Sequence, residues 1–258
     1  MGRLTGVAVA LAAGMILAGT TPAQASDDPL TLTATLDGQD IAGHTMVVTP
    51  RRPVQLSVTV TNNGPSPVHV RSIRLSGTAL ALTFFAYDTT LPFDIAAHGR
   101  ATRTFGLDLA DLDGQAIGLL PASVELFDVG RNELAAVDTV TDVRGSILSV
   151  YGVFGIAVLL LTIAAWVTCL LALARHRLPA NRLRRALRFM PAGFGTGLVA
   201  VVTLSVLRVI PPEPSVEIPI VVGTTVIGLV LGYLTPHPLP QVVEPETTRM
   251  PLTHEVTG

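Results

Sequence analysis

The acidic segment at residues 108–114 is the part of the sequence that most resembles a metal-binding loop. Asp108, Asp111 and Asp113 could supply carboxylate oxygens, the ligands that Ca²⁺ prefers. Aligning the glycine that follows them with the invariant glycine of an EF-hand places Leu120 where the bidentate glutamate belongs. This excludes an EF-hand. An irregular calcium site remains an alternative to a solvent-exposed acidic turn, which we favour.

Other residue types that carry chemistry are scattered or lack their motifs. His44, His69 and His98 fall in three separate parts of the chain, which is more typical of surface histidines than of a metal cluster. The single cysteine, Cys169, lies in an apolar segment and excludes disulfides and thiolate zinc sites. The sequence contains no GxSxG elbow, HExxH, Walker loop or dinucleotide fingerprint. We therefore expect no enzyme activity, no cofactor and no metal.

Long apolar segments in the second half of the chain indicate a membrane protein. Residues 145–174 carry no charge, and about 20 apolar residues suffice to cross a bilayer. We expect membrane-spanning helices at 149–173, 189–208 and 218–234. The third would be only about 26 Å long, slightly short for a hydrocarbon core. A composition of 49% hydrophobic and 14% charged residues agrees with this class.

Positive charge is concentrated between the first two predicted spans. Segment 175–190 contains no acidic residue but the following six arginines: Arg175, Arg177, Arg182, Arg184, Arg185 and Arg188. The positive-inside rule predicts that this loop is cytoplasmic. Asn181 could cap a short basic amphipathic helix lying on the anionic inner leaflet, although the arginines could equally serve topology alone.

The two ends of the chain have the features of a leader and a tail. Arg3, an apolar stretch at 4–19 and a small-x-small site at 23–25 predict a secretory signal peptide over 1–25, with an uncleaved anchor as the alternative. Cleavage would place segment 27–143 outside the cytoplasm. The proline-rich segment 235–258 is expected to be a disordered cytoplasmic tail.

Segment 27–143 has the pattern of an all-β domain. Residues 54–61 alternate apolar and polar side chains, and Asn62-Asn63-Gly64-Pro65 supplies a turn. Strands are predicted at 30–36, 44–49, 54–61, 67–75, 80–87, 101–109, 122–129 and 134–143. This number of short strands predicts an Ig-like sandwich, so the fold class is an all-β ectodomain plus three transmembrane helices. The net negative charge of this segment argues against a nucleic-acid partner.

The run PVQLSVTVTNNGPSPVHVRSIRLSG, followed by AAHGRATRTFGLDL, resembles the bacterial Ig-like modules related to the CARDB cell-adhesion class. The resemblance covers about residues 50–110. It implies a β-sandwich, and it implies that the domain serves as a spacer or a binding platform at the cell surface.

Small residues and one arginine stand out in the last two predicted spans. Close helix packing is expected from a four-residue repeat of small side chains, namely Gly193, Gly197, Thr224, Gly228 and Gly232. Arg208 is the one charge within reach of a span. Such an arginine is a candidate functional residue, but near the outer end it can snorkel or pair with Glu213 or Glu217.

We favour the first of two functions. The first is a membrane-anchored cell-envelope protein whose ectodomain acts as a binding or assembly subunit. Its partners would be the lipid bilayer and either another membrane protein or a second copy, contacted through the helical hairpin. The alternative is a transport-associated protein in which the three spans assemble a small-solute pathway, with the sandwich as a cap. A tethered enzyme is a weaker third possibility, because the ectodomain lacks a nucleophile–base pair.

Overall fold

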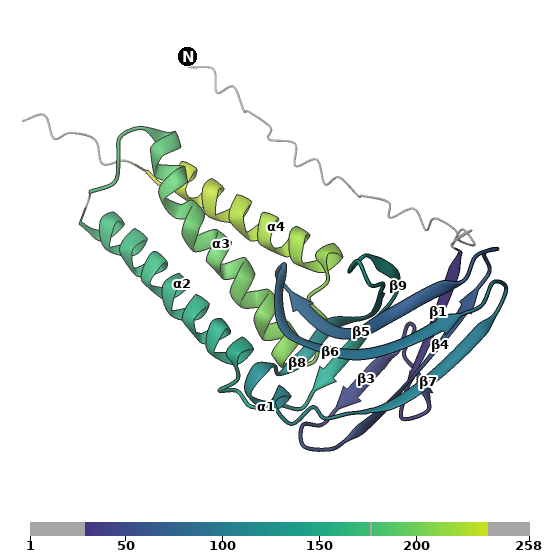
Figure 1. Cartoon of the computed structure of the whole chain (residues 1–258). Coiled ribbons are helices and arrows are strands. Elements are labelled where there is room, and N and C mark those ends of the chain that lie inside the picture. The colour runs from purple at the N-terminus through teal and green to yellow at the C-terminus, as the bar shows by residue number, and fades with distance from the viewer. Residues whose placement is uncertain (1–28, 176, 237–258) are drawn as a thin grey trace, which may run out of the picture.

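The computed structural model describes residues 29–175 and 177–236, which form a β-sandwich followed by a bundle of three long helices (Figure 1). The predicted signal peptide at 1–25 and all but the first two residues of the predicted tail at 235–258 lie outside the described residues.

Two sheets make up the sandwich. The four-stranded sheet has the order β2-β1-β4-β7, and the five-stranded sheet has the order β3-β9-β8-β5-β6. The strands of the first sheet are β1 (Leu30–Leu36), β2 (Gln39–Asp40), β4 (Val54–Asn62) and β7 (Arg100–Leu107). Those of the second are β3 (Thr45–Val48), β5 (Val68–Ala79), β6 (Leu82–Ile95), β8 (Gly118–Phe127) and β9 (Glu133–Val143). Pairing is antiparallel except between β3 and β9.

The core lies between the two sheets and follows from the period-two pattern of the strands. In β4, Val54, Leu56, Val58 and Val60 are buried while the residues between them are not. They belong to one buried apolar cluster with residues of the other sheet, such as Ile73 of β5 and Leu120 of β8. Burying one apolar face of each sheet stabilises the sandwich without a disulfide.

The hairpin of β5 and β6 is longer than the sequence predicts, extending over Val68–Ile95. Its turn consists of Leu80 and Ala81, which both have positive φ, at 52° and 59°. Hairpin turns of two residues with positive φ ordinarily use Asn or Gly, because side chains make this conformation costly. The turn was therefore not recognisable from its residue types.

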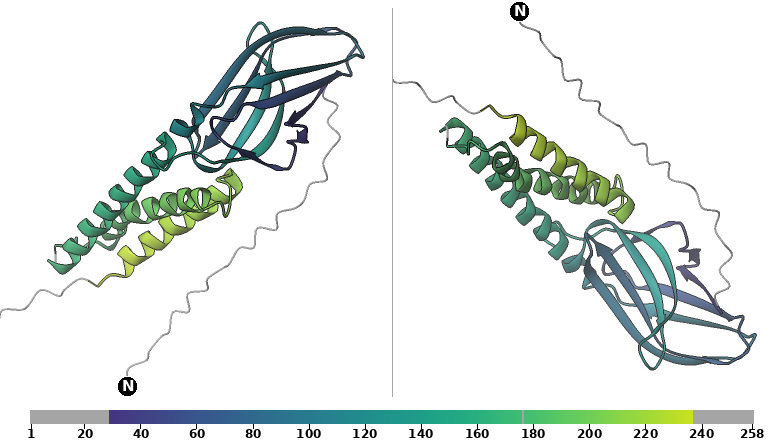
Figure 2. Two further views of the ribbon diagram at one scale, coloured as in Figure 1. Left: turned by 90° about the horizontal axis from the view of Figure 1, so that it is seen from below. Right: turned by 90° about the horizontal axis from the view of Figure 1, so that it is seen from above.

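The three helices are α2 (Val150–Ala174), α3 (Arg182–Val206) and α4 (Pro214–Leu234), and each is long and apolar enough to cross a membrane. A four-residue helix, α1 (Leu112–Gln115), forms in the acidic segment. α3 lies between α2 and α4, and the sandwich sits at one end of the bundle (Figures 1 and 2). The structure therefore indicates a multi-pass membrane protein.

Two of the helices differ from the prediction. The short helix expected within 175–190 is the beginning of α3, and Asn181 caps it by accepting from the N–H groups of Leu183 and Arg184. The predicted short helix and the predicted second span form one continuous helix. Ala186 and Phe189, in its first part, are buried against α4. α4 begins at Pro214 and not at 218, since proline suits the first helical position. At 21 residues it is about 31 Å long and matches a hydrocarbon core.

Candidate functional site

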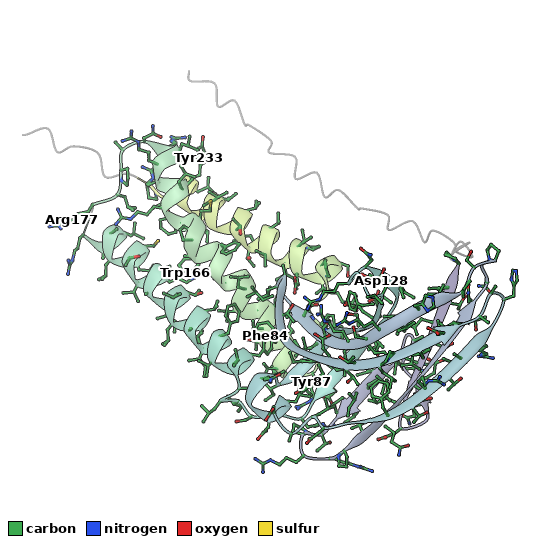
Figure 3. The ribbon with its side chains drawn as sticks, viewed as in Figure 1. Phe84, Tyr87, Asp128, Trp166, Arg177 and Tyr233 are labelled. Atoms are coloured by element: carbon green, nitrogen blue, oxygen red, sulfur yellow. The ribbon has the colours of Figure 1, made fainter. Side chains whose placement is uncertain are left out.

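The sandwich and the helix bundle contact each other in a region that we call the junction. It is built from Leu80, Phe84, Gly118, Leu119 and Asp142 of the sandwich with Tyr151, Ser205, Arg208 and Glu217 of the helices. Its apolar centre is Phe84, whose ring meets Tyr151 at 4.7 Å and Phe154 at 5.8 Å, both edge-on. Phe84 lies where the sandwich meets the helices (Figure 3). This packing makes Tyr151 and Val202 part of the sandwich core.

Asp142, near the end of β9, joins the sandwich to the end of α3. Its Oδ1 accepts from Arg208 Nε at 2.6 Å, and its Oδ2 accepts from Arg144 Nε at 3.2 Å. The side chain of Asp142 is only 8% exposed, and that of Arg208 is 36% exposed. A largely buried carboxylate is thus neutralised by two guanidinium groups, which the cost of burying an unpaired charge requires.

Arg208 was expected to snorkel or to pair with Glu213 or Glu217, and the structure gives it a different partner. The residue follows the end of α3 and has φ of 61°, the left-handed conformation that often ends a helix. Its partner is Asp142, 66 positions earlier in the chain. Arg208 therefore fixes the helix end to the sandwich.

The last turn of α3 also approaches the backbone of β8. Ser205 Oγ donates to the carbonyl oxygen of Leu119 at 2.6 Å. Gly118, with φ of +91°, has room for no side chain, because a Cβ there would lie 2.5 Å from the carbonyl oxygen of Ser205. Glycine is therefore required at this position both by its conformation and by the close contact.

The first turn of α4 holds the tip of the β5–β6 hairpin. Glu217 Oε1 accepts from the backbone N–H of Leu80 at 2.7 Å. Leu80 belongs to the strained two-residue turn, so this bond compensates a costly backbone conformation. With the bonds of Asp142 and Ser205, it makes a third polar attachment between the sandwich and the bundle.

An apolar pocket of about 440 Å³ lies beside this third attachment, between the hairpin tip and the helices. Its lining includes Leu80, Ala81, Pro121, Leu198, Pro212, Ile218 and Val222, together with Glu217. Ile218 and Val222 also belong to the exposed apolar surface of α4. Because its walls are almost entirely apolar, the pocket suits an apolar group and not polar catalysis.

The five small residues predicted to pack helices lie at the contact of α3 with α4. A Cβ on Gly193 would lie 2.5 Å from the carbonyl oxygen of Thr224 and 3.1 Å from the Cα of Gly228. One on Gly232 would lie 2.8 Å from the Cα of Ala186. Gly197 faces Thr224 and Val221 in the same way. These positions are used within the chain, so they do not form a free surface for another protein.

The six arginines predicted to set topology do not form a uniform group. Arg175, Arg177, Arg182, Arg184 and Arg188 are exposed. Arg185 is 3% exposed, and its Nη1 donates to the carbonyl oxygens of Pro179 and Ala180. A surface role is therefore wrong for Arg185, which fastens the loop before α3 to the helix.

Four threonine hydroxyl groups of the spans bond to carbonyl oxygens of their own helices. Thr162 donates to Val158, Thr196 to Ala192, Thr224 to Ile220 and Thr225 to Val221, at 2.6–2.9 Å. Trp166 Nε1 donates across to Thr196 Oγ1 at 3.0 Å and so links α2 to α3 (Figure 3). Hydroxyls used in this way do not favour a polar pathway through the bundle.

Several of the candidate metal ligands interact with other groups of the protein. Asp108 Oδ1 accepts from the N–H of Ala110, and Asp113 pairs with Arg51 at 3.2 Å. His69 Nδ1 lies 2.5 Å from Asp94 Oδ1 on the exposed surface. Within residues 29–175 and 177–236, no three His, Cys, Asp or Glu side chains gather in a way that could hold a metal ion.

Sequence reasoning missed the junction because its polar bonds connect residues 66 to 137 positions apart. Asp142 and Ser205 carried no motif, and Glu217 looked like a charge outside the third span. One signal was present: Asp142 is an acid in an otherwise buried strand end, and such a residue requires a cationic partner.

No protein-family model matches the sequence, and no curated protein matches it. Solved structures resemble parts of the chain with TM-scores of 0.30 to 0.33. The alkylpurine DNA glycosylase AlkC of Pseudomonas fluorescens is 12% identical over 44% of this chain and 30% of its own, at a TM-score of 0.31. A Niemann-Pick type C2 protein from Japanese carpenter ant is 8% identical over 38% of this chain and 79% of its own, at 0.30.

The sporulation control protein Spo0M of Bacillus subtilis is 16% identical over 50% of this chain and 55% of its own, at a TM-score of 0.33. The chain thus spans less than two thirds of AlkC and of Spo0M. Similarities of this size support no inference about the fold family or the function of this chain.

Proposed function

We propose that this chain is a membrane-anchored cell-envelope protein whose extracytoplasmic, Ig-like sandwich acts as a binding or assembly subunit and not as an enzyme. The junction is the observation that carries this proposal. A flexible linker to a membrane helix is sufficient for a domain that only has to be tethered. Here the sandwich is attached to α2 by aromatic packing, to α3 by Asp142–Arg208 and Ser205–Leu119, and to α4 by Leu80–Glu217.

This attachment gives the sandwich one fixed orientation relative to the bundle. Fixed presentation lowers the entropy lost when a partner binds, because fewer orientations must be given up. It also means that a partner contacting the helices and the sandwich together would meet a preformed surface. Both properties favour a role as an assembly subunit.

The proposed orientation rests on charge. The exposed arginines of 175–188 lie at the end of the bundle remote from the sandwich (Figure 1). The positive-inside rule favours the cytoplasm for that end, which leaves the sandwich on the outer side. A cleaved signal peptide at 1–25 would have the same consequence.

The partner we propose is another integral membrane protein. The test is to extract the full-length tagged protein from its host in mild detergent and to measure the mass and composition of the complex. We expect a second membrane protein in fixed stoichiometry. Asp142→Ala should stay in the membrane but retain less of this partner, because one of the three polar attachments that orient the sandwich is lost. Arg52→Gln, on the exposed sandwich surface, is the matched control and should retain it.

Two outcomes would contradict the proposal. One is a wild-type protein that is monomeric after mild extraction and gives no crosslinked partner in intact membranes. The other is a homo-oligomer that alone accounts for the mass, which would make self-assembly the function of the bundle. For crosslinking, Cys169→Ser removes the only native thiol, so that Val222→Cys at the apolar pocket reports on contacts there alone.

A further inference from the structure

A second pocket, of about 400 Å³, lies on the outer face of the five-stranded sheet and is polar. We call it the arginine pocket. It is lined by Arg71, Ser72, Arg74, Asp88, Thr90, Phe127 and Arg131. Three guanidinium groups thus meet around one carboxylate and two hydroxyl groups, which leaves an excess of positive charge.

A β-bulge brings the first two arginines to the same face. Residues three apart on a regular strand point to opposite faces of the sheet, so Arg71 and Arg74 would be separated. The pairing of β5 with β6 shifts register between Val70 and Ser72, at Arg71. Bulges re-aim side chains and are common next to functional sites. Here the bulge lets Arg71 reach the pocket while Ile73 stays in the core.

The third arginine is placed by the turn between β8 and β9. Arg131 has φ of 64°, and the turn around it is fixed by Asp128. Asp128 Oδ1 accepts from the N–H of Asn132 at 2.8 Å, and Oδ2 accepts from Asn132 Nδ2 at 2.9 Å. The backbone beneath Arg131 is therefore held in a defined conformation.

The charges of the pocket are only partly satisfied by the protein itself. Arg74 binds Asp88 in a bidentate manner, with Nε–Oδ1 at 2.8 Å and Nη2–Oδ2 at 3.0 Å, and its guanidinium lies 4.9 Å from the ring centre of Phe127. In the described part of the chain, the side chains of Arg71 and Arg131 have no hydrogen-bond or ion-pair partner. The nearby Glu125 accepts from Ser123 Oγ at 2.7 Å. Arg71 and Arg131 are thus available to an anion.

The pocket lies close to the level at which α4 enters the membrane. Ser123 of β8 borders the start of α4 at Glu213, Pro214 and Ser215. Phe127 is four residues further along the same face of β8, a distance of about 13 Å. In Figure 3, Asp128, which begins the turn of Arg131, lies on the side of the sandwich toward the beginning of α4. Lipid headgroups occupy the zone just outside the hydrocarbon core.

We infer that Arg71, Arg74 and Arg131 form a binding pocket for a phosphate group, supplied in the membrane by an anionic phospholipid headgroup. Guanidinium groups match phosphate oxygens in pairs, and Ser72 and Thr90 add hydroxyl donors. Binding there would hold the sandwich against the bilayer surface on one side. The inference requires membrane insertion but not the assembly role proposed above, so each can fail without the other.

The test uses the purified full-length chain in detergent and a short-chain phosphatidylglycerol at concentrations at which it stays monomeric. Binding is followed by titration calorimetry, with inorganic phosphate as a second probe and competitor. We expect Arg71→Gln/Arg131→Gln to weaken binding about ten- to a hundredfold, from the loss of two charge-assisted contacts. Arg52→Gln/Arg100→Gln removes the same charge elsewhere on the sandwich and should change binding less than about twofold.

The outcomes are distinct. Phosphatidylglycerol binding that depends on Arg71 and Arg131 supports a lipid headgroup site. Binding of inorganic phosphate alone, with the same dependence, supports the pocket but assigns it to free phosphate. Equal binding by the wild type and the double variant overturns the inference. Because both substituted side chains are exposed and unpaired, we expect the double variant to unfold at the same temperature as the wild type. Measuring that temperature is the control for folding.

Discussion

Asp142 and Arg208 form an ion pair between the last strand of the sandwich and the residue that follows α3, with Oδ1 and Nε 2.6 Å apart. The pair connects a largely buried carboxylate of β9 to a partly exposed arginine at the end of α3. It therefore couples the stability of the two parts of the molecule.

Asp142→Ala should lower the free energy of unfolding by about 1–3 kcal/mol, because it leaves Arg208 and Arg144 without their shared acceptor. Arg208→Gln should lower the free energy of unfolding by a smaller amount, because Arg144 still neutralises Asp142. Denaturant titration of the detergent-solubilised protein measures both. If the double variant lost the sum of the two single effects, the residues would not be energetically coupled.

The backbone at Arg208 allows a further control. Arg208→Gly removes the same ion pair but relieves the left-handed conformation at φ 61°. It should therefore be less destabilising than Arg208→Ala, by up to about 1 kcal/mol. Equal effects of glycine and alanine would show that the backbone conformation carries no cost at this site.

The sequence predicted those features that repeat at a short period. The alternation in 54–61 corresponds to β4, and the three apolar segments correspond to α2, α3 and α4. The features it did not predict depend on contacts between distant residues. The turn at Leu80–Ala81 has no glycine or asparagine, and it forms where α4 supplies Glu217 to bind its N–H group.

The arginine pocket left a trace in the sequence that a closer analysis could use. The apolar positions of β5 change phase between Val70 and Ile73, a spacing of three that a regular strand does not allow. That irregularity marks the bulge at Arg71. The partners Asp88 and Arg131, which lie on other segments, left no comparable signal.

The contact of α3 with α4 should be sensitive to a single added methyl group. Gly193→Ala should destabilise the helix pair by about 1–3 kcal/mol, because the new Cβ would meet the backbone at Thr224 and Gly228. Gly223→Ala, in the same region of α4 but with nothing within 4 Å of the new Cβ, should change stability by less than about 0.5 kcal/mol. Unfolding in sodium dodecyl sulfate measures both, and similar losses for the two variants would contradict the observed packing.

Gly77 provides the space for an aromatic ring in the sandwich. A Cβ at this position would overlap the ring of Phe85, which is buried in the core, next to a second register shift of β5. Gly77→Ala should therefore lower the free energy of unfolding by about 1–3 kcal/mol. Gly106→Ala in β7 adds the same methyl group in open space and is the matched control.

A second substitution tests the cause of that loss. In the Phe85→Leu background the ring is absent. Adding Gly77→Ala should therefore lower the free energy of unfolding clearly less than it does in the wild type. The thermal unfolding temperature of the four proteins gives the coupling. A full, additive loss in both backgrounds would mean that the glycine is needed for its backbone conformation and not for the space it leaves.

The ion pair of Arg74 with Asp88 makes stability depend on pH. The hydrogen bond from Arg74 holds the pKa of Asp88 below its ordinary value. Its stabilising contribution is therefore fully present above the unfolded-state pKa of about 4 and is lost as the pH falls through the lower folded-state pKa. Because the Asp88 side chain is 54% exposed, we expect at most about 1 kcal/mol from this pair.

The measurement is the free energy of unfolding at pH 7 and pH 3 for the wild type and Asp88→Asn. Other carboxylates, including Asp128 with its own lowered pKa, titrate in both proteins, so the difference between the two isolates Asp88. The wild type should lose more stability on acidification than the variant, because only the wild type has this carboxylate to protonate. An equal loss in both proteins would show that Asp88 has the same pKa folded and unfolded, and that Arg74 does not stabilise its charge.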